Sequence, residues 1–263
     1  MTAPTLSGKR VLVVGASSGI GRHFARTACL RGAQVGAAAR SRSGLEAAVA
    51  DVGGTLIVGD VTSPDDCRRI VREAVAALGD LDAVFYTPAP GYQVLLRDVR
   101  REEWIAQFDS MVLGACHVTQ AALPHLRHAA VLCYLSSVIT TTPQYGMASY
   151  AACKAALETM VRGWQLEQPD FRFCAIPVGA TAGGSERRQH HENPALTQEI
   201  MRQFVGRGFL QTRIMEASDL GAFLVDTVAN LLAHPEITTS DLRVVPAAPT
   251  MFADDLPPTR TNE

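Results

Sequence analysis

Short apolar runs alternate with segments of helical periodicity along most of this 263-residue chain. The first run, Lys9 to Val14, ends at a cluster of glycines, and apolar residues then recur at helical spacing at Ile20, Phe24 and Ala28. This order predicts a strand, a tight turn and a helix at the start of the chain.

The same alternation continues to residue 245. Further strand-like runs are Gln34 to Ala39, Thr55 to Val58, Leu81 to Tyr86, Ala130 to Leu135, Phe171 to Ile176 and Leu242 to Val245. Helical patterns separate them at residues 43–51, 64–78, 101–127, 149–168 and 217–233. The pattern predicts an α/β fold: a doubly wound parallel sheet of about seven strands, with helices on both faces.

No linker or repeat divides the chain, so residues 1–263 are predicted to form a single domain. Residues 183–215 interrupt the alternation with a polar and basic stretch followed by a helical one, and an insertion of this length predicts a lid over a binding site. The proline-rich residues 246–263 are predicted to form a surface arm.

Composition narrows the class of protein. A hydrophobic content of 47% with a net charge of -2 is typical of a compact globule and excludes a basic nucleic-acid surface. The first eight residues lack a signal-peptide pattern, which predicts a cytoplasmic protein. The uncharged residues 129–153 contain too many polar side chains for a membrane span. The six cysteines lack metal-ligand spacing, so no metal site is expected.

Tyr150 and Lys154 are the strongest candidates for chemistry. A spacing of four on a helix places both side chains on one face, about one turn apart. The chain has only two lysines, Lys9 and Lys154, among 24 basic residues, and an amine has a pKa that its surroundings can shift, unlike a guanidinium. A nearby ammonium favours a phenolate, so Tyr150 is predicted to exchange a proton with a substrate oxygen.

The glycine cluster after the first strand indicates a nucleotide site. It reads Gly15, Ala16, Ser17, Ser18, Gly19, Ile20, Gly21, a variant of the dinucleotide-binding fingerprint. Glycines there permit a tight turn, and the N-terminus of the following helix attracts a pyrophosphate. The alternative is that the glycines serve packing alone.

The end of the second strand predicts which nucleotide binds. An acidic residue there would hold the ribose 2′-hydroxyl of NAD, but the chain has Arg40 followed by Ser41. Because Arg pairs well with a 2′-phosphate, we expect NADP(H), unless Arg40 is merely solvated. After the third strand, Asp60 and Val61 are candidates for contact with the adenine, although Asp60 is equally suited to cap the next helix.

Together these residues resemble the short-chain dehydrogenase/reductase family over nearly the whole chain. The matching residues are Gly15, Gly19, Gly21, Asp60, Val61, Ser137, Tyr150 and Lys154, with Ser137 thirteen positions before Tyr150. The resemblance implies a Rossmann-type domain in which Tyr150 is the general acid/base, Ser137 orients the substrate carbonyl and Lys154 holds the nicotinamide ribose. It also implies a homodimer or homotetramer assembled through the helices at 101–127 and 149–168.

Three segments depart from the family pattern. The usual Asn-Asn-Ala-Gly is replaced by Tyr86, Thr87, Pro88 and Ala89, of which Ala89 is expected beside the nicotinamide. The Asn expected to hold a relay water aligns with Met111, whose thioether is a poor substitute. The usual Pro-Gly becomes Pro177, Val178, Gly179, with Val178 and Thr181 expected near the carboxamide.

The sequence therefore predicts an NADP(H)-dependent oxidoreductase that interconverts a carbonyl and an alcohol on a small to medium metabolite. Two alternatives rest on Met111 and Pro88. One is a non-redox isomerase or cyclase derived from such reductases, and the other is an NADP(H)-binding regulatory protein.

Overall fold

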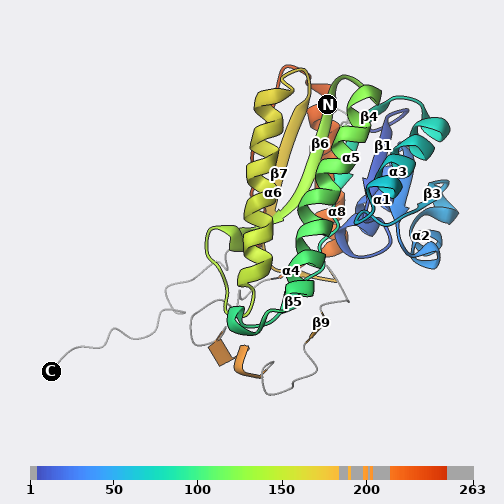
Figure 1. Ribbon diagram of the computed structural model, residues 1–263. Helices are drawn as coiled ribbons and strands as arrows, with labels where there is room; N and C mark the ends of the chain where they lie inside the picture. The colour runs from blue at the N-terminus through green and yellow to red at the C-terminus, as the bar shows by residue number, and fades with distance from the viewer. Residues whose placement is uncertain (1–4, 184–188, 191–197, 201, 204–213, 248–263) are drawn as a thin grey trace, which may run out of the picture.

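The fold is a parallel sheet with helices on both faces (Figure 1). The computed structural model describes residues 5–183, 189–190, 198–200, 202–203 and 214–247. The main sheet has six strands in the order β3-β2-β1-β4-β6-β7. Their bounds are β1 Arg10–Val14, β2 Gln34–Ala39, β3 Thr55–Val58, β4 Leu81–Tyr86, β6 Leu126–Ser137 and β7 Arg172–Val178. All five pairings are parallel, so the carboxyl ends of the strands lie at one edge.

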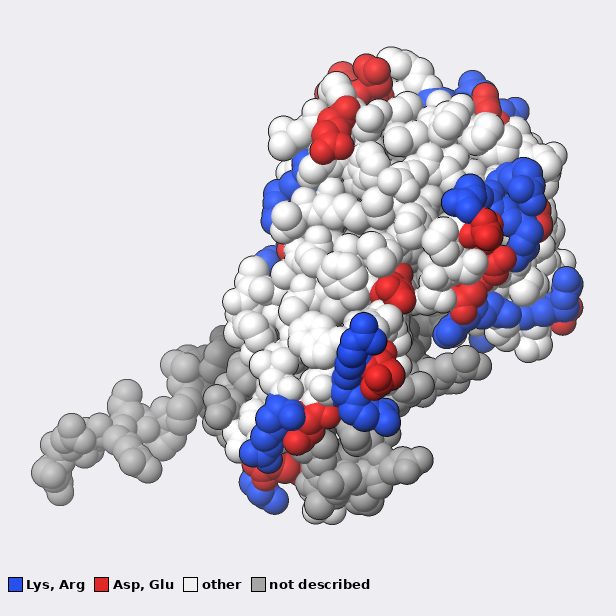
Figure 2. Space-filling view, in the orientation of Figure 1, with Lys and Arg blue, Asp and Glu red and all other residues white. Residues whose placement is uncertain are grey.

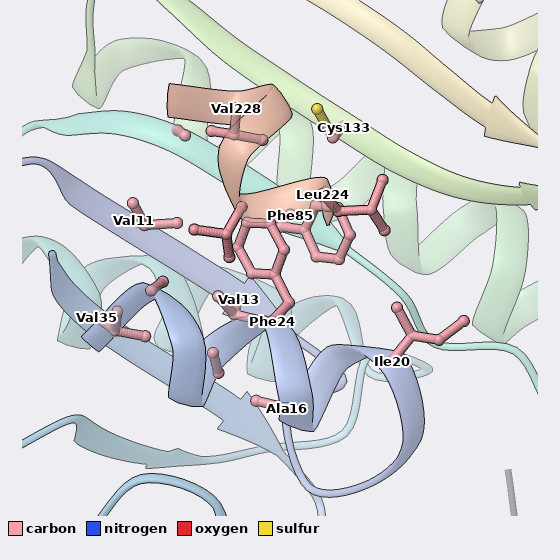
Figure 3. Packing of buried hydrophobic residues seen from close by; sticks show 14 of the residues in the cluster. Val11, Val13, Ala16, Ile20, Phe24, Val35, Phe85, Cys133, Leu224 and Val228 are labelled. Atoms are coloured by element: carbon pink, nitrogen blue, oxygen red, sulfur yellow. The ribbon is translucent and has the colours of Figure 1, made fainter. Parts of the chain in front are cut away.

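Two apolar clusters hold the helices to the sheet. The principal helices are α1 Gly19–Leu30, α2 Arg42–Val49, α3 Pro64–Leu78, α4 Arg101–Phe108, α5 Gly114–Ala122, α6 Ala148–Glu167 and α8 Ala217–Ala233. One cluster joins α1, α2 and α8 to the sheet, and the other joins α3, α5 and α6 to its opposite face. Figure 3 shows the first cluster, in which the rings of Phe24 and Phe85 stack with centroids 3.9 Å apart. Ala16 and Ile20 belong to this cluster, so the core directly supports the glycine-rich turn.

Most predicted elements form as expected, but the middle helix and the last strand differ from their predictions. The helix predicted at 101–127 contains a π-helical turn, Asp109–Leu113, and ends earlier because β6 begins at Leu126. The last strand, predicted at Leu242–Val245, does not form a continuous strand. Only two isolated bridges connect this region to β7, at Asp241 and Val244. The sheet therefore has six strands instead of about seven.

Part of the predicted lid at 183–215 is described. Gln189–His190 forms β9, which pairs with β5 Tyr92–Gln93, and β10 Met215–Glu216 pairs with β8 Thr181–Ala182. Ile200 is buried against Gly146, where an added Cβ would lie 2.9 Å from Ile200 Cδ1. The rest of the lid, and the arm from residue 248 onward, lie outside the described residues.

The outer surface of α5 and α6 carries few charges (Figure 2). Four apolar residues of this region suit either a subunit contact or the core. All four are buried within the single chain: Val112, Ala115, Leu157 and Val161. The exposed apolar side chains of this region are instead Phe108 at the end of α4, Leu113 in the π-helical turn and Leu166 in α6. The homodimer or homotetramer stays a prediction. Among the described residues, no helix combines the length and apolar character that crossing a membrane requires.

Candidate active site

The glycine-rich turn between β1 and α1 packs tightly against the residue that follows β4. Thr87 Oγ1 donates to Val14 O at 3.0 Å, and the Thr87 backbone N–H donates to the same oxygen. A Cβ on Gly15 would lie 2.2 Å from Thr87 Oγ1, and one on Gly21 would lie 2.6 Å from it. Gly15 also has a φ of 89°, which disfavours other residues. The close packing of this turn is therefore sufficient to require glycine at both positions, whether or not a nucleotide binds.

The start of α1 offers space and charge for a phosphate. Gly19, with a φ of 56°, begins the helix, and the preceding Ser18 is exposed and makes no side-chain cap. The first turn carries no acidic residue. Free N–H groups and the positive end of the helix dipole at such a position favour an anion. The residues present thus fit the pyrophosphate of a dinucleotide, with Ser17, Ser18, Gly19 and Ile20 around it.

The β2–α2 connection lies beside this turn. A Cβ on Gly44 would lie 2.8 Å from Ser17 Cβ, which places the start of α2 against the glycine-rich turn. Ser41 caps α2 by accepting from Gly44 N. The Arg40 side chain is 69% exposed, and its ion pair with Asp60 spans 3.9 Å. A guanidinium so weakly held is available to a ligand phosphate.

Asp60 organises the turn before α3 and does not cap that helix. Its Oδ1 accepts from the backbone N–H and the hydroxyl of Thr62, at 3.0 and 2.9 Å. The cap of α3 is Ser63, whose side chain accepts from Asp66 N. Val61 is buried beneath this turn. Contact of Asp60 and Val61 with an adenine stays a prediction.

Lys154 joins the start of α6, which carries Tyr150, to the carboxyl end of β6, the strand that ends at Ser137. Ser137 is the last residue of β6, and its Oγ accepts from Ile139 N at 3.5 Å. Tyr150 and Lys154 lie in the first two turns of α6, with Lys154 Nζ 5.8 Å from the centroid of the Tyr150 ring. Lys154 is fully buried and donates to Leu135 O at 2.5 Å. An ammonium has three donors, so two remain for other acceptors.

Burial changes the ionisation of Lys154. Loss of water around the ammonium lowers the pKa of Lys154 to about 7, although Cys153 and Glu158 act in the opposite direction. The side chain therefore titrates near neutral pH in the folded protein. Its charge is sensitive to small changes in the surrounding residues.

This shift makes the stability of the fold depend on pH. An unfolded lysine titrates near ~10.4, so above about pH 7 the unfolded chain binds more protons than the folded one, and stability rises with pH. Lys154 alone is expected to add ~1.5 kcal/mol to the free energy of unfolding between about pH 7 and about pH 8.5. Over the same range, buried thiols with raised pKa, such as Cys67, lower the free energy of unfolding as pH rises, so the Lys154 contribution is the difference between wild type and a Lys154 variant.

Urea unfolding at several pH values measures this effect. The stability of wild type relative to Lys154→Met should rise with pH over this range, whereas Lys9→Met, which replaces a partly exposed lysine, should follow the wild-type profile. A constant difference between wild type and Lys154→Met would show that Lys154 keeps an ordinary pKa in the fold.

The π-helical turn places Met111 against the catalytic candidates. Met111 is fully buried in a small cluster with Val112 and Cys153, and Tyr150 packs against that cluster. Tyr86, aligned with the first Asn of the family pattern, donates from its hydroxyl to Ser110 O at 2.6 Å. The position expected to hold a relay water is therefore apolar. π-Helical turns frequently occur at functional sites.

The remaining predicted cofactor residues border the same edge of the sheet. Ala89 packs against the Met111 cluster, and a Cβ on Gly91 would lie 4.0 Å from Tyr150 Cδ2. Pro177 and Val178 end β7, and Thr181 Oγ1 donates to Gly179 O at 3.1 Å. These loops surround the end of β6, but cofactor contact by each residue stays a prediction.

Two hydrogen-bonded pairs near the site were not predicted from the sequence. Gln107 Nε2 donates to Ser149 Oγ at 3.2 Å, which ties α4 to the residue before Tyr150. Ser136 Oγ donates to Glu158 Oε1 at 2.6 Å. Helical spacing could have indicated one residue of each pair, because Gln107 is four residues before Met111 and Glu158 is four residues after Lys154.

Comparison with known proteins identifies the family. The family model for short chain dehydrogenases matches residues 9–192. The chain therefore belongs to the short-chain dehydrogenase family. Members of this family are oxidoreductases that bind a nicotinamide cofactor.

Known relatives are similar to this chain over about two thirds of its length. An 11-beta-hydroxysteroid dehydrogenase-like 2 protein of Arabidopsis thaliana is 31% identical over 183 residues, 65% of this chain and 59% of the relative. The 11-beta-hydroxysteroid dehydrogenase 1A of the same plant is 35% identical over 62% of this chain and 49% of its own length. An uncharacterized oxidoreductase of Mycobacterium tuberculosis is 37% identical over 65% of this chain and 69% of its own. The chain thus matches only about half to three-fifths of the two plant relatives.

Two solved structures share the fold over nearly the whole chain. A dehydrogenase/reductase from Sinorhizobium meliloti superposes with a TM-score of 0.78 at 22% identity, covering 93% of this chain and 96% of its own. A short chain dehydrogenase from Burkholderia cenocepacia, solved in complex with NADP, gives 0.74 at 23% identity, covering 91% and 97%. At this identity the likeness shows the fold alone.

Proposed function

We propose that the protein is an NADP(H)-dependent oxidoreductase that interconverts a carbonyl and an alcohol on a small to medium metabolite. The arrangement of Tyr150 and Lys154 beside the end of β6 carries this proposal. The phenol of Tyr150 and the buried amine of Lys154 lie 5.8 Å apart, from ring centroid to nitrogen, and the amine bonds to the strand that ends at Ser137. Family membership adds the redox chemistry to this acid/base arrangement.

Each catalytic candidate has a distinct role in the proposal. Tyr150 donates a proton to the carbonyl oxygen during reduction and removes it during oxidation. Lys154, when protonated, stabilises the phenolate form of Tyr150 and has donors left for the nicotinamide ribose. Ser137, fixed at the end of β6, orients the carbonyl oxygen toward Tyr150. When bound, the nicotinamide supplies or accepts the hydride.

The preference for NADP(H) rests on Arg40. Its exposed guanidinium, only weakly paired with Asp60, stands where the 2′-substituent of the adenosine ribose is expected. Ser41 and Ser17 border the same position. That the Burkholderia cenocepacia structural relative was solved with NADP agrees with this preference.

A panel of carbonyl compounds tests the proposal. The purified protein is mixed with NADPH and, separately, with simple ketones, diketones and 3-oxoacyl thioesters, and the loss of reduced-nicotinamide absorbance is followed. We expect turnover of at least one class with NADPH. Tight NADPH binding without turnover of any carbonyl would favour the regulatory alternative, which the buried Met111 and the loop at Pro88 motivate.

Met111 gives a second prediction about the reaction. Met111→Asn is expected to equal or exceed the wild-type turnover rate, because an amide at this position can hold the relay water. Its melting temperature should fall, since burying an amide among Val112 and Cys153 costs about 1–3 kcal/mol unless its groups find partners.

The control for this prediction is Met111→Leu, which keeps the position apolar and should leave the rate unchanged. Turnover and thermal unfolding are measured for all three proteins. A severe loss of rate in a folded Met111→Asn protein would show that Met111 belongs to a repacked site with no place for the relay.

A further inference from the structure

Consecutive residues at the end of β6 are held by one face of α6. Leu135 O accepts from Lys154 Nζ at 2.5 Å, and the next residue, Ser136, donates from Oγ to Glu158 Oε1 at 2.6 Å. Lys154 and Glu158 are four residues apart and so lie one turn apart on the helix. Ser137, the third residue in this row, carries the hydroxyl assigned to the substrate. The two contacts therefore fix the strand end just before Ser137.

Burial makes these contacts strong. Lys154 and Ser136 are each 1% exposed, while Glu158 is half-buried. The carboxylate of Glu158 thus reaches inward to a hydroxyl that bulk water does not reach. A hydrogen bond to a charged group in such surroundings exceeds the usual neutral one in strength.

Glu158 also borders a cavity. With Arg162, Gln165 and Ala175 it lines a cavity of about 250 Å³ between α6, β7 and residues 240–241. On this side of the molecule α6 runs beside β6 and β7 (Figure 1).

We propose that Glu158 and Ser136 are positioning residues for the proton-transfer pair, with Ser136 holding the Glu158 carboxylate one turn from Lys154 so that Lys154 stays protonated. The proposal rests on the function proposed for Lys154. It also assigns a role to the first serine of the Ser136–Ser137 pair, which the catalytic scheme leaves unused.

Few other charges face Lys154 among the described residues. Its own helix supplies Tyr150, Cys153 and Glu158, and the latter two raise the Lys154 pKa while burial lowers it to about 7. The neighbouring turn at Met111 carries one carboxylate, Asp109, and Glu103 at the start of α4 is paired with Arg100. Of the carboxylates on the described residues, Glu158 is the one whose charge acts on the Lys154 pKa.

The titration of Lys154 can be observed directly because the chain has only two lysines. Protein labelled with ¹³C at the lysine Cε positions gives two NMR signals, and Lys9→Arg assigns them. Glu158→Gln removes the charge but keeps an acceptor for Ser136, whereas Ser136→Ala removes the bond but keeps the charge. Glu167→Gln, at the exposed end of the same helix, is the matched control.

We expect Glu158→Gln to lower the titration midpoint of Lys154 by about one pH unit, since opposite charges about one helical turn apart interact by a few kcal/mol at most. Ser136→Ala should lower it less, and Glu167→Gln should leave it unchanged. Equal Lys154 midpoints in wild type and Glu158→Gln would overturn the proposal, and an unchanged midpoint in Ser136→Ala would remove Ser136 from it. Neither measurement requires a substrate, so inactivity toward every carbonyl would contradict the proposed function alone.

Discussion

Tyr150→Phe is expected to lower the turnover rate by about 10²–10⁴-fold, the contribution of a positioned general acid/base. The phenyl ring keeps the packing of Tyr150 against Met111 and Val112, so the variant should fold and bind NADPH as the wild type does. Only the hydroxyl that exchanges a proton is lost. The effect should appear in kcat more than in KM, because the interaction forms in the transition state.

Steady-state kinetics with the best carbonyl of the panel measures this loss, and NADPH binding and thermal unfolding serve as controls. Ser137→Ala offers a comparison, because it removes the orienting hydroxyl without touching the proton donor. If Tyr150→Phe kept more than about a tenth of the wild-type rate, another group would have to supply the proton.

Arg40→Gln is expected to weaken NADPH binding by about 10–100-fold and to leave NADH binding unchanged. The estimate corresponds to the ~1.5–3 kcal/mol of a hydrogen-bonded contact between charged groups. The change should not disturb the fold, since the Arg40 side chain is 69% exposed and its pairing with Asp60 spans 3.9 Å.

Fluorescence titration with each nucleotide measures the two dissociation constants. Arg42→Gln is the matched control, because Arg42 is also exposed and lies two residues further on, at the first position of α2. Equal binding of NADPH and NADH by the wild type would defeat the assignment of Arg40. A similar loss in Arg42→Gln would indicate general attraction by positive charge instead of recognition of the 2′-phosphate.

Regular periodicity made much of the fold predictable. The strand at Gln34–Ala39 and the helices at Pro64–Leu78 and Ala217–Ala233 have the bounds that their patterns predict. The fold class followed from the alternation of such elements. The bounds of β6 were wrong, because the polar Arg127 and His128 extend it through an irregular stretch between the pairs Leu81–Leu126 and Ala83–Val131, which has no alternating apolar pattern.

Features that depend on tertiary contacts were not predictable. The pattern at Leu242–Val245 predicts a strand, but this region is joined to β7 at the sheet edge only by two isolated bridges, at Asp241 and Val244. The π-helical turn around Met111 has no periodic signature, and Tyr86 bonds to it from a distant strand. The sequence placed Tyr150 and Lys154 together because a helix fixes their spacing, but the bond from Ser136 to Glu158 joins residues 22 positions apart.

Transfer of deuterium from NADPH to the substrate tests the proposed redox function most directly. The protein is incubated with NADPH deuterated at the reactive nicotinamide carbon and with a carbonyl compound that it consumes, and the product is analysed by mass spectrometry. The proposed function predicts an alcohol with one deuterium on the former carbonyl carbon. Consumption of the carbonyl with all deuterium left on the nucleotide would contradict it and indicate a non-redox reaction.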